Sequence, residues 1–304
     1  MKQLFLILFS CILLTVNAQD WNIPKVGDGG WEVEQEFTLN KKRRNILLIS
    51  EASAYTVALV GLNQLWYADY PKSSFHFIND NEEWLQMDKM GHMSASYYTG
   101  VAGIKAYEWA GFSRKNAIWY GGMTGSIFLT VIEVLDGTSE QWGASSGDLI
   151  ANTTGSLLAI GQALKWNEQR IQLKYSYSPS NMAAKNPEQL GSNHLERALK
   201  DYNGQTYWLT LNLKSLLQIE NPDFPSWLSL ALGYSAYEMV NPYHEEGDAE
   251  RYRQFLMSFD VDLNKIKTKN KTLNSVLHTF GFLKFPTPAI QYRNGNIFFH
   301  PIYY

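Results

Sequence analysis

The sequence predicts an α+β fold in which about four apolar, small-residue-rich helices form an N-terminal bundle, followed by an antiparallel β region. Before about residue 166, apolar residues come in long blocks at helical spacing, and after it they come in short alternating runs. Turn-forming pairs such as Asn203-Gly204 and Asn294-Gly295 separate the alternating runs. With 304 residues, the chain is long enough for one large domain or two modest ones.

The first eighteen residues have the order of a cleavable secretory signal. Lys2 supplies a positive charge, an apolar run follows at 4–16, and Val16-Asn17-Ala18 fits the small-x-small cleavage pattern. The apolar run is too short for a membrane-spanning helix. We therefore expect cleavage after Ala18, with Gln19 as the first mature residue.

A lipoprotein signal is the alternative interpretation of the same segment. Leu8-Phe9-Ser10-Cys11 resembles a lipoprotein box, which would place a lipid on Cys11. The residues after Cys11 stay largely apolar, where a lipoprotein tether usually turns polar. This favours cleavage after Ala18, and the expected domains are then a signal peptide at 1–18, an extension at 19–44, a helical domain at 45–166 and a β-rich region at 167–304.

Composition limits the class of partner. Cys11 is the single cysteine, so the mature chain forms no disulfide. A net charge of −3 argues against a general nucleic-acid partner. Aromatic residues make up 14% of the chain, which is typical of a membrane interface, a sugar-binding surface or a tightly packed core. The predicted partner is a bacterial membrane or envelope component, and the oligomeric state is left open.

Four helices are predicted in the first half, at 45–67, 87–109, 116–135 and 146–166. Ser145 with Asp148 three residues later is a helix-start signal of the capping-box type. Gly111 and Gly137 follow the second and third helices and would end them. Many glycines and alanines lie within these helices, and small residues allow close backbone approach in membrane bundles and in tightly packed soluble bundles alike.

Two of these helices raise the question of membrane insertion. The first and third are long enough to span a bilayer. Glu51, Glu133 and Asp136 argue against spanning, because charges inside spans are costly. After signal cleavage the basic run at 41–44 would lie on the outer side, against the positive-inside rule, although an uncleaved signal would restore that rule. We therefore expect an exported protein in the periplasm, associated with the outer membrane.

The second half predicts strands at 170–178, 205–213, 227–237, 254–263 and 296–304, with a short amphipathic helix at 272–282. Strands of about ten residues that carry aromatics are typical of outer-membrane barrels. Five or six strands are too few, since such barrels need about eight. A curved sheet packed on the helices is the favoured prediction.

Polar residues gather within the otherwise apolar second, third and fourth helices. They come in pairs three or four residues apart, so each pair shares a helix face. If the helices bundle, these side chains converge at one end. The residues are Asp88, Lys89, His92, Glu133, Asp136, Asp148 and Asn152.

The segments DKMGHMSASYYTG and IEVLDGTSEQWGASSGDLIANTTGS, within 87–155, resemble the YfiM-type family of uncharacterised bacterial envelope proteins. KDYNGQTYWLTLN, FDVDL and HPIYY look like a Bacteroidetes-type version with an added C-terminal region. The pattern Asp-Lys-x-x-His, Glu, Asp-x-x-x-Asn-x-x-Gly is also similar to VanZ-like membrane proteins linked to glycopeptide resistance. The cleavable signal and strand-rich tail depart from VanZ, so an inner-membrane location does not carry over. The resemblance implies location and fold more than chemistry.

Three roles are open for the polar residues. Asp88, His92 and Glu133 could ligate a divalent cation, the one cofactor the sequence suggests. Alternatively, Lys89 could hold the anion of a lipid-linked phosphate or sugar while His92 moves a proton and Glu133 or Asp136 orients the imidazole.

The third role is structural, with Asp88 and Asp148 capping helices and Lys89 pairing with Glu133 in a buried network. The sequence has no His-Glu-x-x-His or Cys-x-x-Cys motif. We therefore favour a non-catalytic, membrane-associated binding or scaffolding role. The alternative is a hydrolase-type enzyme of envelope lipid or peptidoglycan metabolism that uses Asp88, His92 and Glu133.

Overall fold

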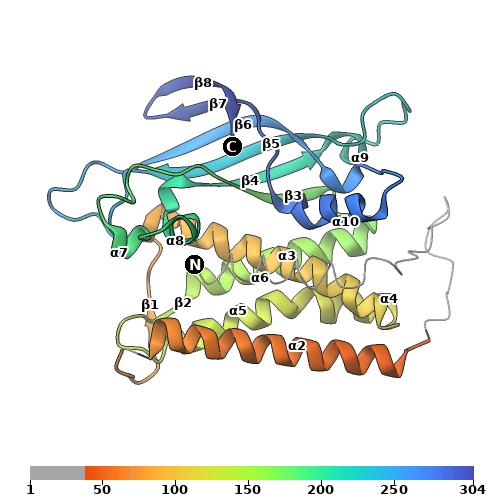
Figure 1. The fold of residues 1–304 in the computed structure, drawn as a ribbon, viewed down its shortest axis with the longest axis horizontal. Coiled ribbons are helices and arrows are strands. Elements are labelled where there is room, and N and C mark those ends of the chain that lie inside the picture. Colours follow the sequence, from red (N-terminus) through yellow and green to blue (C-terminus); the bar gives the residue numbers. More distant parts are fainter. Residues whose placement is uncertain (1–37, 69) are drawn as a thin grey trace.

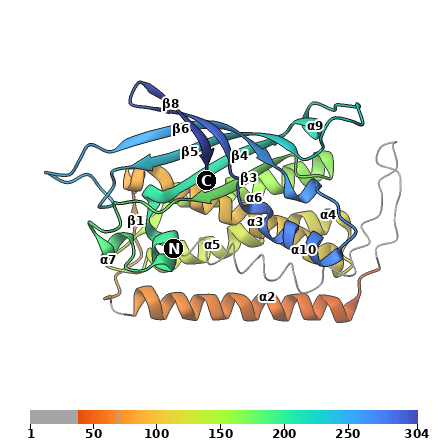
Figure 2. The same cartoon turned by 45° about the horizontal axis from the view of Figure 1, so that its top comes forward.

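The structure of the protein is a computed structural model, which describes residues 38–68 and 70–304. A helical layer and a sheet lie one over the other, and α2 runs along the side of the helical layer away from the sheet (Figures 1 and 2). The predicted signal peptide and most of the predicted extension lie outside the described residues. The α+β prediction is confirmed.

The helical layer closely follows the predicted segments. Its elements are α2 (Lys41–Leu62, continued by a π-helical turn, Asn63–Tyr67), α3 (Met87–Trp109), α4 (Arg114–Asn116, followed by a π-helical turn, Ala117–Gly121), α5 (Gly122–Asp136) and α6 (Ser146–Trp166). α2 starts earlier than expected because the Asn40 side chain accepts a hydrogen bond from the backbone N–H of Arg43. The predicted start of α6 is confirmed, since Ser145 Oγ accepts from the Asp148 N–H at 3.1 Å.

α3, α5 and α6 pack closely because glycines lie where they cross. A Cβ atom on Gly155 of α6 would lie 2.1 Å from the carbonyl oxygen of Met93 in α3. α2 is different, because Ala54, Ala58 and Leu62 are the buried residues among its 22, all of which the structure describes. The four-helix bundle therefore stays a prediction.

Among the residues that the structure describes, two helical stretches are long and apolar enough to cross a membrane, by length and composition alone: Lys41–Leu62 and Arg114–Asp136. Within the protein, 56% of the second is buried, as in the core helix of a globular protein, against 17% of the first. The second stretch thus packs within this fold, whereas little of α2 is buried.

The sheet is antiparallel throughout and follows chain order, β3–β4–β5–β6–β7–β8. Its strands are β3 (Ile171–Tyr177), β4 (Gln205–Asn212), β5 (Leu228–Tyr237), β6 (Tyr252–Val261), β7 (Thr287–Arg293) and β8 (Asn296–Tyr303). Sequence analysis missed β7, because Pro286 and Pro288 make the segment look like a loop. The strand accommodates Pro288 at a register shift between Thr287 and Ala289.

Short elements lie in the connections between the main helices and strands. They are a parallel bridge of β1 (Phe77–Ile78) with β2 (Ala144–Ser145), and the helices α7 (Pro187–Leu190), α8 (His194–Lys200), α9 (Leu213–Leu216) and α10 (Lys271–Thr279). The predicted helix at 272–282 is confirmed as α10 with a following 3-10 turn, Phe280–Phe282.

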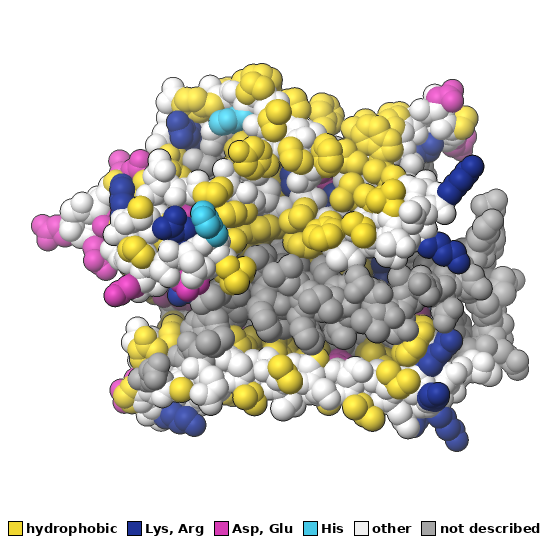
Figure 3. All heavy atoms as spheres, in the orientation of Figure 1, with side chains coloured by type: hydrophobic (Ala, Val, Ile, Leu, Met, Phe, Trp, Pro, Cys, Tyr) yellow, Lys and Arg dark blue, Asp and Glu magenta, His cyan; other side chains and the backbone are white. Residues whose placement is uncertain are grey.

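The outer face of the sheet is apolar. One row of residues pairs in turn across β4 to β8, and its members are 37% to 67% exposed: Leu209, Leu232, Met257, Ile290 and Phe299. Figure 3 shows hydrophobic side chains gathered over the part of the molecule that the sheet occupies. At the end of this face nearest the helices, Tyr175, Tyr207 and Tyr234 pack into the core shared by the two layers.

The opposite, inner face is rich in polar and small residues, yet it is buried. Lys174 of β3 and Asp260 of β6 form an ion pair there at 2.6 Å, with both side chains 0% exposed. Trp208 Nε1 donates to Ser176 Oγ at 2.9 Å, and its ring meets the ring of Tyr303 from β8. The sheet is therefore curled around a polar interior and turns large apolar side chains outward.

Candidate functional site

Residues from three helices converge where α3 and α6 begin and α5 ends. His92 of α3, Glu133 of α5, and Asp148 and Asn152 of α6 are each less than 5% exposed. With Asp80, Asp88 and Lys89, they form what we call the polar cluster. The spacing-based prediction of convergence at one end of the helices agrees with this arrangement.

The imidazole of His92 is held from one side and faced by carboxylates on the other. Its Nδ1 lies 2.9 Å from Oδ1 of Asn152. A carbonyl oxygen only accepts, so Nδ1 carries the proton and Nε2 presents a lone pair in the neutral ring. Nε2 lies 3.7 Å from Asp88 Oδ2 and 3.8 Å from both Glu133 Oε1 and Asp148 Oδ2.

In two of these carboxylates, the oxygen that faces away from His92 accepts a hydrogen bond from another residue. Tyr202 Oη donates to Asp88 Oδ1 at 2.6 Å, and the backbone N–H of Ser145 donates to Glu133 Oε2 at 2.9 Å. Such outer contacts fix the orientation of a carboxylate. In both residues the other oxygen is the one that faces His92 Nε2.

Lys89 is the cation of the cluster. Its Nζ lies 2.5 Å from Asp80 Oδ2, 3.2 Å from Asp148 Oδ1 and 3.3 Å from Asp148 Oδ2. Asp80 also accepts a 2.5 Å hydrogen bond from Ser145 Oγ, the group that caps α6. The pairing of Lys89 with Glu133 that the structural hypothesis assumed is replaced by these two partners, because the Asp80 loop lies closer to Lys89.

Burial and crowding of like charge shift the acidities. Burial raises the pKa of Glu133 to about 8, and the neighbouring Asp148 adds to the rise while His92 opposes it. Burial also raises the pKa of Asp148 to about 9, with Asp88 adding and Lys89 opposing. For Lys89, burial lowers the pKa, but the surrounding carboxylates outweigh it and the net shift is upward.

Asp136 is placed differently from the other candidates. It is buried at the end of α5 and accepts a 2.6 Å hydrogen bond from Tyr67 Oη. The hypothesis gave Asp136 the role of orienting the imidazole. In the structure it is Asn152 that is hydrogen-bonded to the Nδ1 atom of His92.

Asp80 and Tyr202 were not recognised from the sequence. Asp80 stands in the polar turn NDNEE, which is typical of a solvated loop, and Tyr202 lies 114 residues from the Asp88 that it contacts. Nothing in the local sequence of either residue signals its place in the cluster.

A strained turn leads into α3. Trp84, Leu85 and Gln86 have positive backbone φ angles of 47°, 48° and 70°, which residues other than glycine rarely adopt. Contacts from the β region hold this turn: Tyr234 Oη donates to the Leu85 carbonyl at 2.5 Å, and the Trp84 ring packs on Tyr202 at 5.3 Å. The sheet thus positions the helix that carries Asp88, Lys89 and His92.

An open pocket of about 510 Å³ adjoins the cluster. Lys89 is both a wall of this pocket and a member of the cluster, and Met90, Met93 and Ile150 form apolar walls. The pocket therefore combines one cationic side chain with apolar walls.

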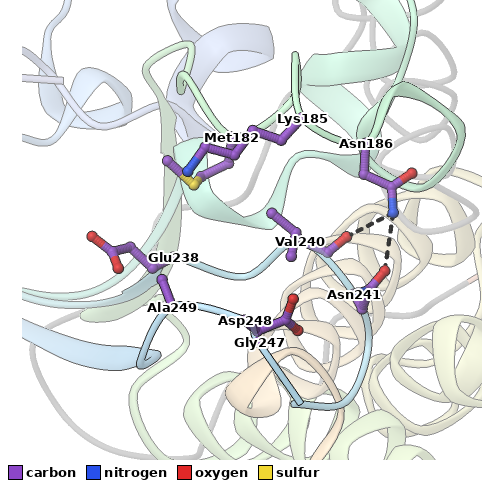
Figure 4. Close-up of a pocket in the computed structure, with 9 residues that line it drawn as sticks. All are labelled: Met182, Lys185, Asn186, Glu238, Val240, Asn241, Gly247, Asp248 and Ala249. Atoms are coloured by element: carbon purple, nitrogen blue, oxygen red, sulfur yellow. Dashed lines mark hydrogen bonds between the residues drawn. The ribbon is translucent and has the colours of Figure 1, made fainter. Parts of the chain in front are cut away.

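A second pocket, of about 410 Å³, lies between loops of the β region (Figure 4). Lys185, Glu238 and Asp248 are among its lining residues. The Asn186 amide there donates to the Val240 carbonyl at 3.1 Å and to Asn241 Oδ1 at 3.0 Å, so it holds the loops together. Of the residues predicted from the sequence, Lys89 lines the first pocket.

Residues 75–162 match a family described as "Predicted periplasmic lipoprotein (DUF2279)". The helical core of this chain is similar to that family. The match contains all seven residues predicted from the sequence, and it supports an exported, periplasmic protein of an uncharacterised family. No curated protein and no solved structure matches the chain.

Proposed function

We propose that this envelope protein works at a membrane surface, which it contacts with the apolar outer face of its sheet, and that it binds an envelope component there. The observation that carries the proposal is the inverted patterning of the sheet. Polar side chains fill its buried interior, and large apolar side chains point outward.

This pattern is unfavourable in water and favourable in contact with lipid. A sheet in a water-soluble protein buries its apolar face and exposes its polar one. Here Met257 and Phe299, on the exposed face, are 48% and 67% exposed, whereas the ion pair of Lys174 and Asp260 is fully buried. A large contiguous exposed apolar patch marks an interaction site, and polar-in, apolar-out alternation is typical of strands against a bilayer.

α2 offers a second apolar surface, on the side of the helical layer away from the sheet (Figure 1). Ile49, Val57 and Val60 on this helix are 66%, 66% and 56% exposed. The helix begins with the basic run at 41–44, and basic residues next to an apolar surface are attracted to anionic headgroups.

A lipid on Cys11 would be a second attachment, in line with the description of the matched family. This lipid and the sheet face would then both hold the protein at the membrane. The lipoprotein alternative for the signal then replaces cleavage after Ala18.

Membrane fractionation on a density gradient, a carbonate wash and N-terminal analysis test the proposal. We expect the protein to sediment with the outer membrane and to resist the wash. Cys11→Ser removes the acyl site, and Met257→Glu with Phe299→Glu charges the sheet face. The matched control is Leu195→Glu on α8, which also replaces an exposed leucine, at 68%.

We expect the double sheet variant to be washed off while the Leu195→Glu control stays bound. If Cys11→Ser alone releases the whole protein and the double sheet variant stays attached, membrane contact through the sheet is wrong and the lipid is the anchor. Circular dichroism of each purified variant verifies that it is folded.

A second candidate function, a hydrolase-type enzyme of envelope lipid or peptidoglycan metabolism, is favoured by Lys89. This residue lies between an apolar-walled pocket and the carboxylates around His92, where it could hold a phosphate. His92→Gln should then abolish complementation of a deletion strain while the folded protein accumulates normally. Full complementation by this variant would contradict the enzyme hypothesis and leave the binding role.

A further inference from the structure

We propose that His92, Asp88, Asp148 and Glu133 form a binding site for one divalent transition-metal ion. The inference goes beyond the membrane role and does not depend on it. It rests on the geometry of four donor atoms and on the contacts that aim them.

The donor atoms have the separation of a coordination shell. Nε2 of His92 is 3.7 to 3.8 Å from one oxygen of each carboxylate, too long for hydrogen bonds. A metal ion at about 2.1 Å from each ligand would hold tetrahedral ligand atoms about 3.4 Å apart. The ligand atoms of Asp88, His92 and Asp148 lie within 4.8 Å of one another, and Glu133 lies beside the same nitrogen as a fourth ligand.

Three of the four ligands are each oriented by a group behind them. Asn152 holds the Nδ1 of His92, so the Nε2 lone pair points at the carboxylates. Tyr202 holds the far oxygen of Asp88, and the Ser145 N–H holds that of Glu133. Metal-ligating histidines and carboxylates have outer partners of this kind.

The charge of the cluster calls for a cation. Asp80, Asp88, Glu133 and Asp148 are four carboxylates, and Lys89 supplies one ammonium. Lys89 already lies between Asp80 and Asp148, so one ammonium serves the negative charges of four carboxylates. A buried divalent ion would compensate them.

The donor set selects the class of metal. One imidazole nitrogen with three carboxylate oxygens is borderline in softness, which suits Zn²⁺, Mn²⁺ or Fe²⁺ better than Mg²⁺ or Ca²⁺, whose sites are built from oxygen alone. The Asp88 side chain is 20% exposed, so an ion can enter past it.

The test uses the full-length protein purified in detergent from the envelope fraction. Metal content is measured on the protein as isolated, and calorimetric titrations with Zn²⁺ and Mn²⁺ follow after treatment with a chelator. We expect one ion per chain. His92→Gln and Glu133→Gln keep the side-chain size and should weaken binding by more than about 100-fold, because outer-shell partners alone contribute roughly 10–100-fold.

Asp136→Asn is the matched control, since it neutralises another buried carboxylate on the same helix, one that is bonded to Tyr67. It should bind metal within about threefold of the unmodified protein, a smaller change than loss of an outer-shell partner causes. If His92→Gln fails to fold, Asp88→Asn at the more exposed ligand replaces it. Absence of stoichiometric binding of either ion, or equal binding by Glu133→Gln and the unmodified protein, would overturn the metal site.

Discussion

The Nδ1 atom of His92 lies 2.9 Å from Oδ1 of Asn152, and this hydrogen bond joins α3 to α6 inside the polar cluster. It connects two residues 60 positions apart in the chain, and it decides which imidazole nitrogen faces the carboxylates. This one hydrogen bond therefore affects both the stability of the fold and the chemistry of the site.

Replacing Asn152 should affect both properties at once. Asn152→Leu leaves the buried Nδ1–H of His92 without its acceptor, which costs about 1–3 kcal/mol of unfolding free energy. Metal affinity should fall roughly 10–100-fold, because the lone pair is no longer aimed. Urea denaturation of the metal-free protein and calorimetric titration measure the two effects. Thr153→Ala, at the exposed neighbouring position, should leave both within about 0.5 kcal/mol.

The hydroxyl of Tyr202 ties the β region to the site. Tyr202→Phe removes a 2.6 Å hydrogen bond to the Asp88 carboxylate, and a bond to a charged group is worth about 1.5–3 kcal/mol. Tyr175→Phe is the control, because its hydroxyl donates to the neutral carbonyl of Ala198, a bond worth about 0.5–1.5 kcal/mol. Equal losses of unfolding free energy in the two variants would argue against an ionised Asp88.

Two glycines of α6 should respond in opposite directions to alanine. At Gly155 a new Cβ would lie 2.1 Å from the Met93 carbonyl, so Gly155→Ala must push α6 away from α3 and destabilise the fold. At Gly161 a Cβ would meet no heavy atom within 4 Å among the residues the structure describes, and alanine should stabilise the helix by about 1 kcal/mol. Thermal unfolding of both variants tests the crossing, and a stabilised Gly155→Ala would contradict it.

Helix positions could be read from the sequence because their signals are local. Apolar periodicity and the Ser145 cap place α6, and three- and four-residue spacing predicts that Asp148 and Asn152 share a face. Contacts across long separations leave no such signal, which is why Asp80 and Tyr202 were missed.

The faces of the sheet illustrate a second limit of sequence analysis. Alternation shows that Phe255, Met257 and Phe259 share one face and that Gln254, Ser258 and Asp260 share the other. It does not show which face is buried. In this protein the polar set is buried, because Lys174 and Lys284 also point into the interior and provide partners for it.

The buried Lys284 should give the protein a distinctive pH dependence. Burial lowers the pKa of its ammonium to about 8, with Lys174 adding to the effect and Asp260 opposing it. The unfolded chain titrates near the ordinary lysine value, about 10.4, so between these two pKa values the unfolded state binds more protons and stability rises with pH. Below pH 8 the full cost of burying the charge is present, and above the unfolded pKa it is gone.

Lys284→Met keeps much of the side-chain volume and removes the titrating group. The unfolding free energies of this variant and of the unmodified protein are measured from pH 7.5 to 10.5. As the pH rises, the difference between them should change steadily in favour of the unmodified protein. Other titrating groups cancel in this difference, because they are common to both proteins. Parallel curves would mean that the Lys284 ammonium keeps an ordinary pKa, held by its contacts with Thr287 and the Trp208 ring, and that the interior of the sheet solvates charge better than its burial implies.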